Sequence, residues 1–399
     1  MSTTAERMRT WTGPAILGYG FRPFFLGAGL WAVLAMALWV GVLTGRLALP
    51  TAFDAISWHA HEFLYGYLGA VVAGFLLTAV PNWTGRLPIT GWALGGLALL
   101  WLAGRGAVAV SQYLPPLVVA LADLSLPIAL GAVIAREIVV GRNWRNLMVL
   151  GMLAAFALGN AIFHWEAAQG GFAARGYGLR LGLAAALMMI AVIGGRVVPS
   201  FTRNWLVRRG PGRLPVAPMQ RFDKLALLAL LAALLLWVAL PAHPVTGVAL
   251  LIAGVLHVAR LGRWAGHRTR AEPLVWVLHA GYAFLPLGAL ALAAAILAGA
   301  GPGLAAAQHL WMAGAVGLMT LAVMTRATLG HSDRALTAGP GTVAIYLALI
   351  AAVALRLAAG LWPGAAGALH SLSGLAWLGA FGGFAALYGP LHLRRKPPG

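Results

Sequence analysis

The sequence predicts an all-α, polytopic membrane protein with about twelve transmembrane helices. Of its 399 residues, 61% are hydrophobic and only 9% are charged, which leaves too little polar surface for a water-soluble domain of this length. Apolar stretches of roughly 20 residues, the length that crosses a bilayer as a helix, follow one another along the chain. Basic residues gather in alternate loops, as in multi-pass proteins. We therefore expect one integral membrane domain over residues 1–399.

Helix ends are expected where proline, glycine or charged residues interrupt the apolar pattern. The interruptions divide the chain into twelve segments of bilayer-spanning length. The expected helices are 24–45, 57–80, 91–110, 114–135, 144–165, 177–198, 223–241, 245–261, 273–298, 304–327, 340–361 and 366–390.

The net charge of 28 − 9 = +19 would suit a nucleic-acid partner, but the distribution of the basic residues indicates membrane topology instead. Counted by side, 23 of the lysines and arginines fall in one set of loops and 5 in the other. The richer side is cytoplasmic by the positive-inside rule. We expect the N-terminus (1–22), a basic loop (199–222) and the tail (392–399) in the cytoplasm. The expected partner is the lipid bilayer and not nucleic acid.

A short pattern recurs four helices apart. The motif Val-Pro-x-aromatic-Thr occupies residues 80–84 at the end of the second helix and residues 198–202 at the end of the sixth. A looser Val-Met-Thr-Arg, residues 323–326, ends the tenth. This spacing predicts three units of four helices. The alternative is chance, because proline and threonine are common at helix exits.

Histidine is the residue most informative about chemistry. The chain has no cysteine, so imidazole is the main remaining ligand for a borderline metal, and ionisable side chains inside a bilayer are functional hypotheses by default. At the expected periplasmic level we predict a metal centre formed by His59, His61, His164 and His309. Glu62 lies at the same level and is a candidate to orient a ring or relay protons.

The geometry of a regular helix limits how His59 and His61 can act. At about 100° per residue they point about 200° apart. They therefore cannot easily share one metal, and we expect one to bind it while the other serves a second centre or binds loop groups. The plainer reading is that each histidine is a satisfied polar residue at a helix end.

A second layer of histidines is expected near the cytoplasmic side. His257 and His279 fall at matching depth on neighbouring antiparallel helices, which predicts a cofactor-binding pair. His331 lies just outside the tenth helix on that side, where Arg196 and Arg326 could pair with anionic groups. The other histidines in loops or at interfaces receive the plainer reading; these are His243, His267, His370 and His392.

Five stretches of the sequence resemble the NnrS family closely. Residues 58–62 read Trp-His-Ala-His-Glu, and residues 73–86 read Ala-Gly-Phe-Leu-Leu-Thr-Ala-Val-Pro-Asn-Trp-Thr-Gly-Arg. The others are Phe-Arg-Pro-Phe-Phe at 21–25, Gly159-Asn160 with His164, and Met-Thr-Arg-Ala-Thr-Leu-Gly-His at 324–331. The likeness spans nearly the whole chain. Phe63 stands where the family often has methionine.

The resemblance implies a haem- and copper-containing inner-membrane protein of bacteria that meet nitric oxide. The family is associated with resistance to nitric oxide and to nitrosative stress, which implies a diatomic ligand and redox chemistry at the metals. The repeat also resembles the catalytic subunit of haem–copper oxidases, with the second, sixth and tenth helices innermost. The sixth helix contributes no histidine to such a plan.

Two other functions stay open at this point. One is a sensor of metal or nitric oxide that performs no turnover. The other is a secondary transporter, for which a membrane-embedded acid would mark the substrate site. Asp123 is the acid closest to the middle of an expected helix.

Overall fold

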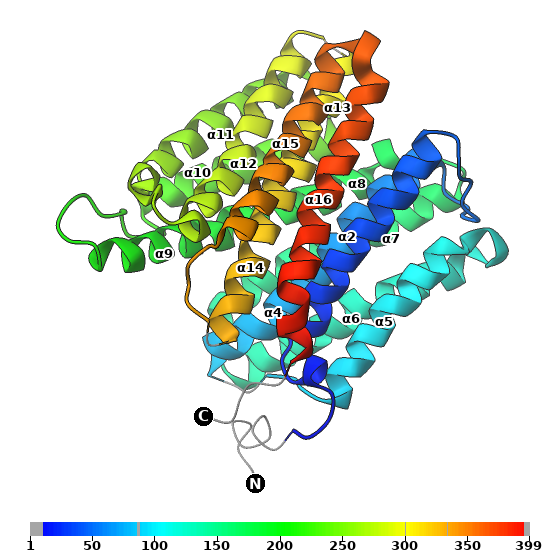
Figure 1. Ribbon diagram of the computed structural model, residues 1–399. Helices are drawn as coiled ribbons and strands as arrows, with labels where there is room; N and C mark the ends of the chain where they lie inside the picture. Colours follow the sequence, from blue (N-terminus) through cyan, green and yellow to red (C-terminus); the bar gives the residue numbers. More distant parts are fainter. Residues whose placement is uncertain (1–10, 86–87, 300, 333, 395–399) are drawn as a thin grey trace. The chain divides into compact units, whose positions relative to one another are not determined.

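The fold is all-α, as predicted. The computed structural model describes residues 11–85, 88–299, 301–332 and 334–394, which form helices and no strand (Figure 1). Twelve helical segments in these residues are long and apolar enough to cross a membrane. They correspond one to one with the twelve expected helices, with ends shifted by a few residues. The expected termini at 1–22 and 392–399 lie partly outside the described residues, as does Arg86 at the end of the second motif.

The described residues group into two compact units, and the single integral membrane domain stays a prediction. The first is built from residues 11–182 with 331–332 and 384–394, and the second from 183–330 and 334–383. In the first, α4 packs against α2 and α6, and α6 also packs against α5 and α7. The helices of this unit are α2 (Phe21–Leu43), α3 (Ala55–His61), α4 (Leu68–Thr84), α5 (Trp92–Ala109), α6 (Pro116–Val140) and α7 (Leu147–Ala168).

In the second unit, α11 packs between α10 and α12. Its helices are α9 (Gly195–Val207), α10 (Arg221–Ala239), α11 (Pro244–Gly262), α12 (Pro273–Leu297), α13 (Gly301–His309), α14 (Met319–His331) and α15 (Pro340–Leu361). Two further helices contribute several residues to each unit, α8 (Tyr177–Met189) and α16 (Ala366–Leu393), and the last residue of α14, His331, belongs to the first unit.

The second, sixth and tenth spans share two properties. Of their most apolar 18 residues, 78%, 67% and 67% are buried, against at most 50% in any other described span. Each also contains a π-helical stretch: η2 (Glu62–Tyr67), η6 (Ile190–Gly194) and η8 (Leu310–Leu318). Such stretches are rare and frequently lie at functional sites. These three spans are therefore the most buried of those described, while the oxidase-like arrangement with these helices innermost stays a prediction.

Helix ends follow ordinary capping chemistry. Asp54 begins α3, because its carboxylate accepts hydrogen bonds from the backbone N–H groups of Ile56 and Ser57 at 3.0 and 2.9 Å. Proline fills the first helical position of α6, α11, α12 and α15, where its missing N–H costs nothing. Gly85 ends α4 in the left-handed region at φ 68°.

The segment 199–222, predicted as a loop from its proline and basic residues, begins as helix. α9 continues through Pro199 to Val207. Val198, Thr202 and Leu206, spaced four residues apart, are buried along one side of α9, and the Thr202 hydroxyl donates to the Val198 carbonyl at 2.8 Å. This buried side keeps the helix in place, so irregular backbone starts only after Val207.

Candidate metal centre

The first unit buries a polar group whose central residue is His61. This histidine is the last residue of α3, and the helix continues directly into the π-helical stretch η2 at Glu62. Neither His61 nor Glu62 is exposed. His61 Nδ1 lies 3.0 Å from Glu62 Oε1, so the carboxylate holds one ring nitrogen and leaves the other, Nε2, facing α6 and α7.

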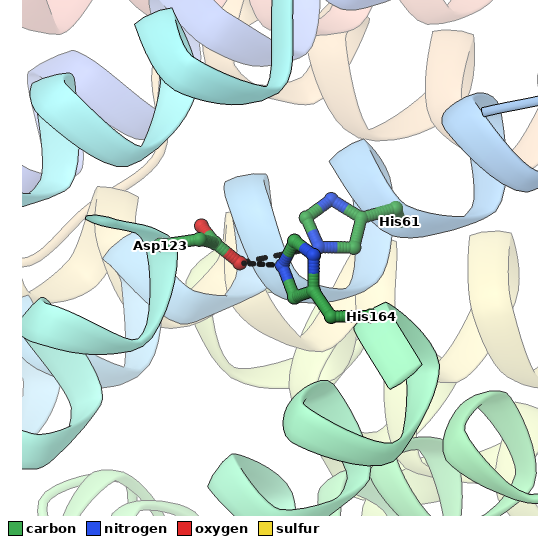
Figure 2. A group of neighbouring side chains, drawn as sticks. All are labelled: His61, Asp123 and His164. Carbon is green, nitrogen blue, oxygen red and sulfur yellow. Dashed lines mark hydrogen bonds and ion pairs between the residues drawn. The ribbon is translucent and has the colours of Figure 1, made fainter. Parts of the chain in front are cut away.

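Asp123, Asn160 and His164 approach His61 from these two helices. Asp123 lies inside α6, while Asn160 and His164 are four residues apart on α7 and so share one face of it. Asp123 Oδ2 lies 3.0 Å from His164 Nε2 and 3.2 Å from His61 Nε2, and it accepts a hydrogen bond from Asn160 Nδ2 at 2.7 Å. Figure 2 shows both imidazoles turned toward the Asp123 carboxylate.

The geometry of three of these side chains suits a metal ion. His61, Asp123 and His164 each offer one ligand atom, and these atoms lie within 4.8 Å of one another. All three residues are buried. Two imidazoles and a carboxylate are ligands that copper and zinc accept. The contact between Glu62 and His61 matches the carboxylate–histidine pairs that orient metal-bound imidazoles.

Arg105 completes the group from α5. Its Nη1 donates to Glu62 Oε1 at 2.5 Å, and its Nη2 donates to Asp123 Oδ1. A Cβ atom at Gly66 would lie 2.6 Å from Arg105 Nη1 and 2.8 Å from Glu62 Oε2, so only glycine lets η2 pass this close. The group thus contains two carboxylates and one guanidinium, with a formal charge of −1 when both histidines are neutral.

The hydrogen bonds around His61 also indicate that the group lacks one positive charge. Asn160 uses its amide N–H₂ on Asp123, so its Oδ1 faces His61 Nε2 at 3.0 Å. Both nitrogens of His61 therefore face oxygen atoms that accept hydrogen bonds, but a neutral imidazole carries only one N–H. One extra cation at Nε2, a proton or a metal ion, satisfies the second nitrogen and balances the charge of the group. The residues present therefore fit a metal.

The other two predicted metal ligands lie elsewhere. The His59 ring stacks on Trp39, with ring centroids 4.3 Å apart, and lies 4.8 Å from Phe63. The His61 ring instead contacts Phe53, Tyr65 and Phe163, in keeping with the opposed directions expected for the two rings. His309 belongs to the second unit, where its Nδ1 donates to the Ala305 carbonyl of its own helix at 2.7 Å.

The predicted cofactor pair, His257 and His279, lies on two helices that pack together, but both rings bind protein groups. Tyr282 Oη accepts from Arg260 and donates to His257 Nδ1, both at 2.8 Å, while His257 Nε2 donates to the Ala226 carbonyl at 3.1 Å. His279 Nε2 lies 2.7 Å from Thr202 Oγ1. His279 Nδ1 is buried without a hydrogen-bond partner among the described residues, and a Cβ atom at Gly266 would lie 2.5 Å from it. As arranged, the pair does not fit haem ligation by both rings.

The remaining predicted cofactor residues are also separate from the polar group. His331 falls in the first unit, where its ring lies 4.9 Å from Tyr19 and 5.4 Å from Phe21. In the second unit, the Arg326 guanidinium lies 4.1 Å from the centre of the Phe201 ring, and Arg196 is exposed on α9.

Sequence reasoning missed Arg105 and undervalued Asp123. Arg105 is one of the five basic residues on the poorer side, and the sequence suggests a role for Asp123 only in transport. The available signal was their position on consecutive antiparallel helices: Arg105 lies four residues before the end of α5, and Asp123 seven residues after the start of α6. A long arginine side chain spans that difference in depth, so the two opposite charges could have been paired.

Comparison with known proteins assigns the chain to one family. The family model described as NnrS protein matches residues 15–396. No curated protein matches the chain.

Proposed function

The chain belongs to the NnrS family, and from this premise we propose that it is a copper-binding protein of the bacterial inner membrane that handles nitric oxide or a related diatomic ligand. The observation that supports the proposal is the buried group His61–Asp123–His164. His61 and His164 would supply imidazole nitrogen and Asp123 carboxylate oxygen. Copper bound there would supply one-electron redox chemistry and an affinity for diatomic ligands.

Copper suits the charge of the site as well as its ligands. The group carries a formal charge of −1, so a single positive charge, that of copper(I), makes it neutral in a buried setting where net charge is costly. Glu62 would hold the His61 ring in the orientation that directs Nε2 to the metal. Its other oxygen, Oε2, is buried and has no hydrogen-bond partner among the described residues, so it could hold or pass on a proton during redox chemistry.

Haem, the second cofactor implied by the family likeness, receives no site in this proposal. His257 has both nitrogens hydrogen-bonded to protein groups, and His279 Nε2 is hydrogen-bonded to Thr202, so the two rings are not both free to bind iron. We therefore assign no step to haem, and an absorption spectrum of the purified protein would show whether it is present.

The proposed orientation places both chain ends in the cytoplasm. It rests on the 23-to-5 split of basic residues. Reporter fusions after Arg213 and Arg268 should read cytoplasmic, and a fusion near Pro244 should read periplasmic. The opposite reading at any of them would overturn this topology.

Copper content of purified variants tests the proposed site. The wild-type protein should contain one copper per chain after reconstitution, and His61→Ala or His164→Ala should lose it. His59→Ala and His309→Ala are matched controls that should retain full copper, because neither ring joins the group. Full copper in both His61→Ala and His164→Ala would refute the assignment.

A secondary transporter is the second candidate, and one observation favours it. Arg105 and Asp123 form a buried ion pair inside the spans, and charges buried in membrane helices often mark ion or substrate pathways. Absence of copper from the reconstituted wild-type protein would favour this reading. A sensor without turnover would instead bind copper but consume no nitric oxide.

A further inference from the structure

A narrow cavity borders the polar group in the first unit. Its walls come from α4, α5, α6 and α7 and from Tyr65 of η2. One end is formed by Arg105, Asp123 and Asn160, and the rest is apolar, with Leu126, Leu153 and Phe156 among its walls. We propose that this cavity binds a small, uncharged, apolar molecule of the diatomic-gas class beside the His61–Asp123–His164 group.

The position of the lining residues gives the cavity its direction. Leu126 lies about one helical turn beyond Asp123 along α6, while Phe156 and Leu153 lie one and two turns before Asn160 on the antiparallel α7. The apolar walls therefore extend from the polar group along the helices, away from the end at which His164 lies. A molecule dissolved in hydrocarbon would meet no charged side chain before Arg105 and Asp123.

Size and polarity define the class of ligand. The cavity has room for about one or two water-sized molecules, which excludes a quinone or a lipid chain. A trapped water needs two to four polar partners. The polar atoms here are largely engaged with each other: Asp123 Oδ1 accepts from Arg105, and Asp123 Oδ2 accepts from Asn160 and His164. An apolar molecule needs no such partner, and an ion would lose its hydration without replacement.

Gly69 keeps the cavity open. It lines the cavity, and a Cβ atom added there would meet no described atom within 4 Å. Gly131 on α6 has the same free space around its Cβ position but does not line the cavity. A side chain can therefore begin at either position without a clash at its Cβ atom, but only one at position 69 starts from the cavity wall, and leucine there is expected to fill the cavity. The two substitutions form a matched pair.

Xenon binding tests the cavity without any metal. The copper-free protein in detergent would be titrated with xenon and followed by ¹²⁹Xe NMR, with the Gly69→Leu, Gly69→Ala and Gly131→Leu variants beside the wild type. Wild type and Gly131→Leu should show saturable binding. Gly69→Ala should bind more weakly, and Gly69→Leu at least tenfold more weakly. Absence of saturable binding in the wild type, or equal binding in Gly69→Leu, would overturn the proposal.

The role of the cavity at the metal rests on the proposed function and has its own test. Carbon monoxide binding to the copper(I)-loaded protein, followed by the C–O stretch, should be at least tenfold slower in Gly69→Leu than in Gly131→Leu. Equal rates of carbon monoxide binding in the two variants would show that the cavity does not lead ligands to the metal. If the chain binds xenon but no copper, the cavity stands and the proposed function fails.

Discussion

Two buried polar networks, one in each unit, use similar residues to different effect. The first contains Glu62, Arg105 and Asp123 with His61 and His164, and the second contains Asp223, Arg260, Tyr282 and His257. Each places one arginine against an aspartate inside the spans. The second is balanced, because Arg260 Nε donates to Asp223 Oδ1 at 2.8 Å and no other carboxylate joins it in the described contacts.

The histidines show the same difference. His257 has a donor, the Tyr282 hydroxyl, at one nitrogen and an acceptor, the Ala226 carbonyl, at the other, as one neutral tautomer requires. His61 faces acceptors at both nitrogens, in a network with one carboxylate more than it has guanidinium groups. We conclude that the second network is balanced in charge and serves structure, while the first is built to receive one more positive charge.

The largest expected effect separates the two networks by stability. Asp223→Asn leaves Arg260 buried without a counter-charge, which should cost about 3–5 kcal/mol in unfolding free energy. Asp123→Asn should cost less in copper-free protein, because Arg105 keeps Glu62 as a partner. Thermal unfolding in detergent measures both, with Asp54→Asn at an exposed helix cap as a control. Equal losses at 123 and 223 would contradict the difference in charge balance.

Copper should stabilise the protein through the first network alone. A ligand present at 100 times its dissociation constant adds about 2.7 kcal/mol to stability. Wild type and His257→Ala should therefore both show this gain on addition of copper, although His257→Ala starts from lower stability. His61→Ala should show none. A gain in His61→Ala as large as in the wild type would place the copper elsewhere.

Glycine at position 66 is expected to be needed for the first network to form. A Cβ atom there would crowd Arg105 Nη1 and Glu62 Oε2, and overpacking of this kind costs about 1–3 kcal/mol. Gly66→Ala should therefore lower both thermal stability and copper content. Gly69→Ala, three residues further along the same span and free of contacts within 4 Å, is the control and should change neither. Normal copper content in Gly66→Ala would show that the network tolerates displacement of Arg105.

Much of the fold was predictable from the sequence. For the candidate site, only the depth of its residues in the membrane was predictable. The length that crosses a bilayer fixes helix number, and all twelve expected helices are present. Depth brought His61 and His164 to one level, and helix periodicity separated His59 from His61. Depth does not say how each helix is rotated about its axis, and the π-helical stretch at Glu62 changes that rotation locally. The contacts of Arg105 and Asp123 depend on such rotation, so they emerged only from the structure.

The smallest expected change in stability comes from Glu62→Gln. This substitution is informative because it should leave copper-free stability nearly unchanged while it weakens copper binding. Arg105 Nη1 and His61 Nδ1 both contact Glu62 Oε1, so the amide oxygen of glutamine can take the place of that atom and accept from both. The charge of the first network then balances, as in the second. Copper-free stability should stay within about 1 kcal/mol of wild type or rise, while copper affinity should fall about 10- to 100-fold, the usual loss for a group that orients a metal ligand.

Glu166→Gln is the matched control, because it is the same substitution in the same unit. The Glu166 carboxylate accepts from the backbone N–H groups of Tyr177 and Gly178, so this variant should lose stability and keep its copper affinity. If Glu62→Gln binds copper as tightly as wild type, the surplus negative charge of the first network is not what attracts the metal.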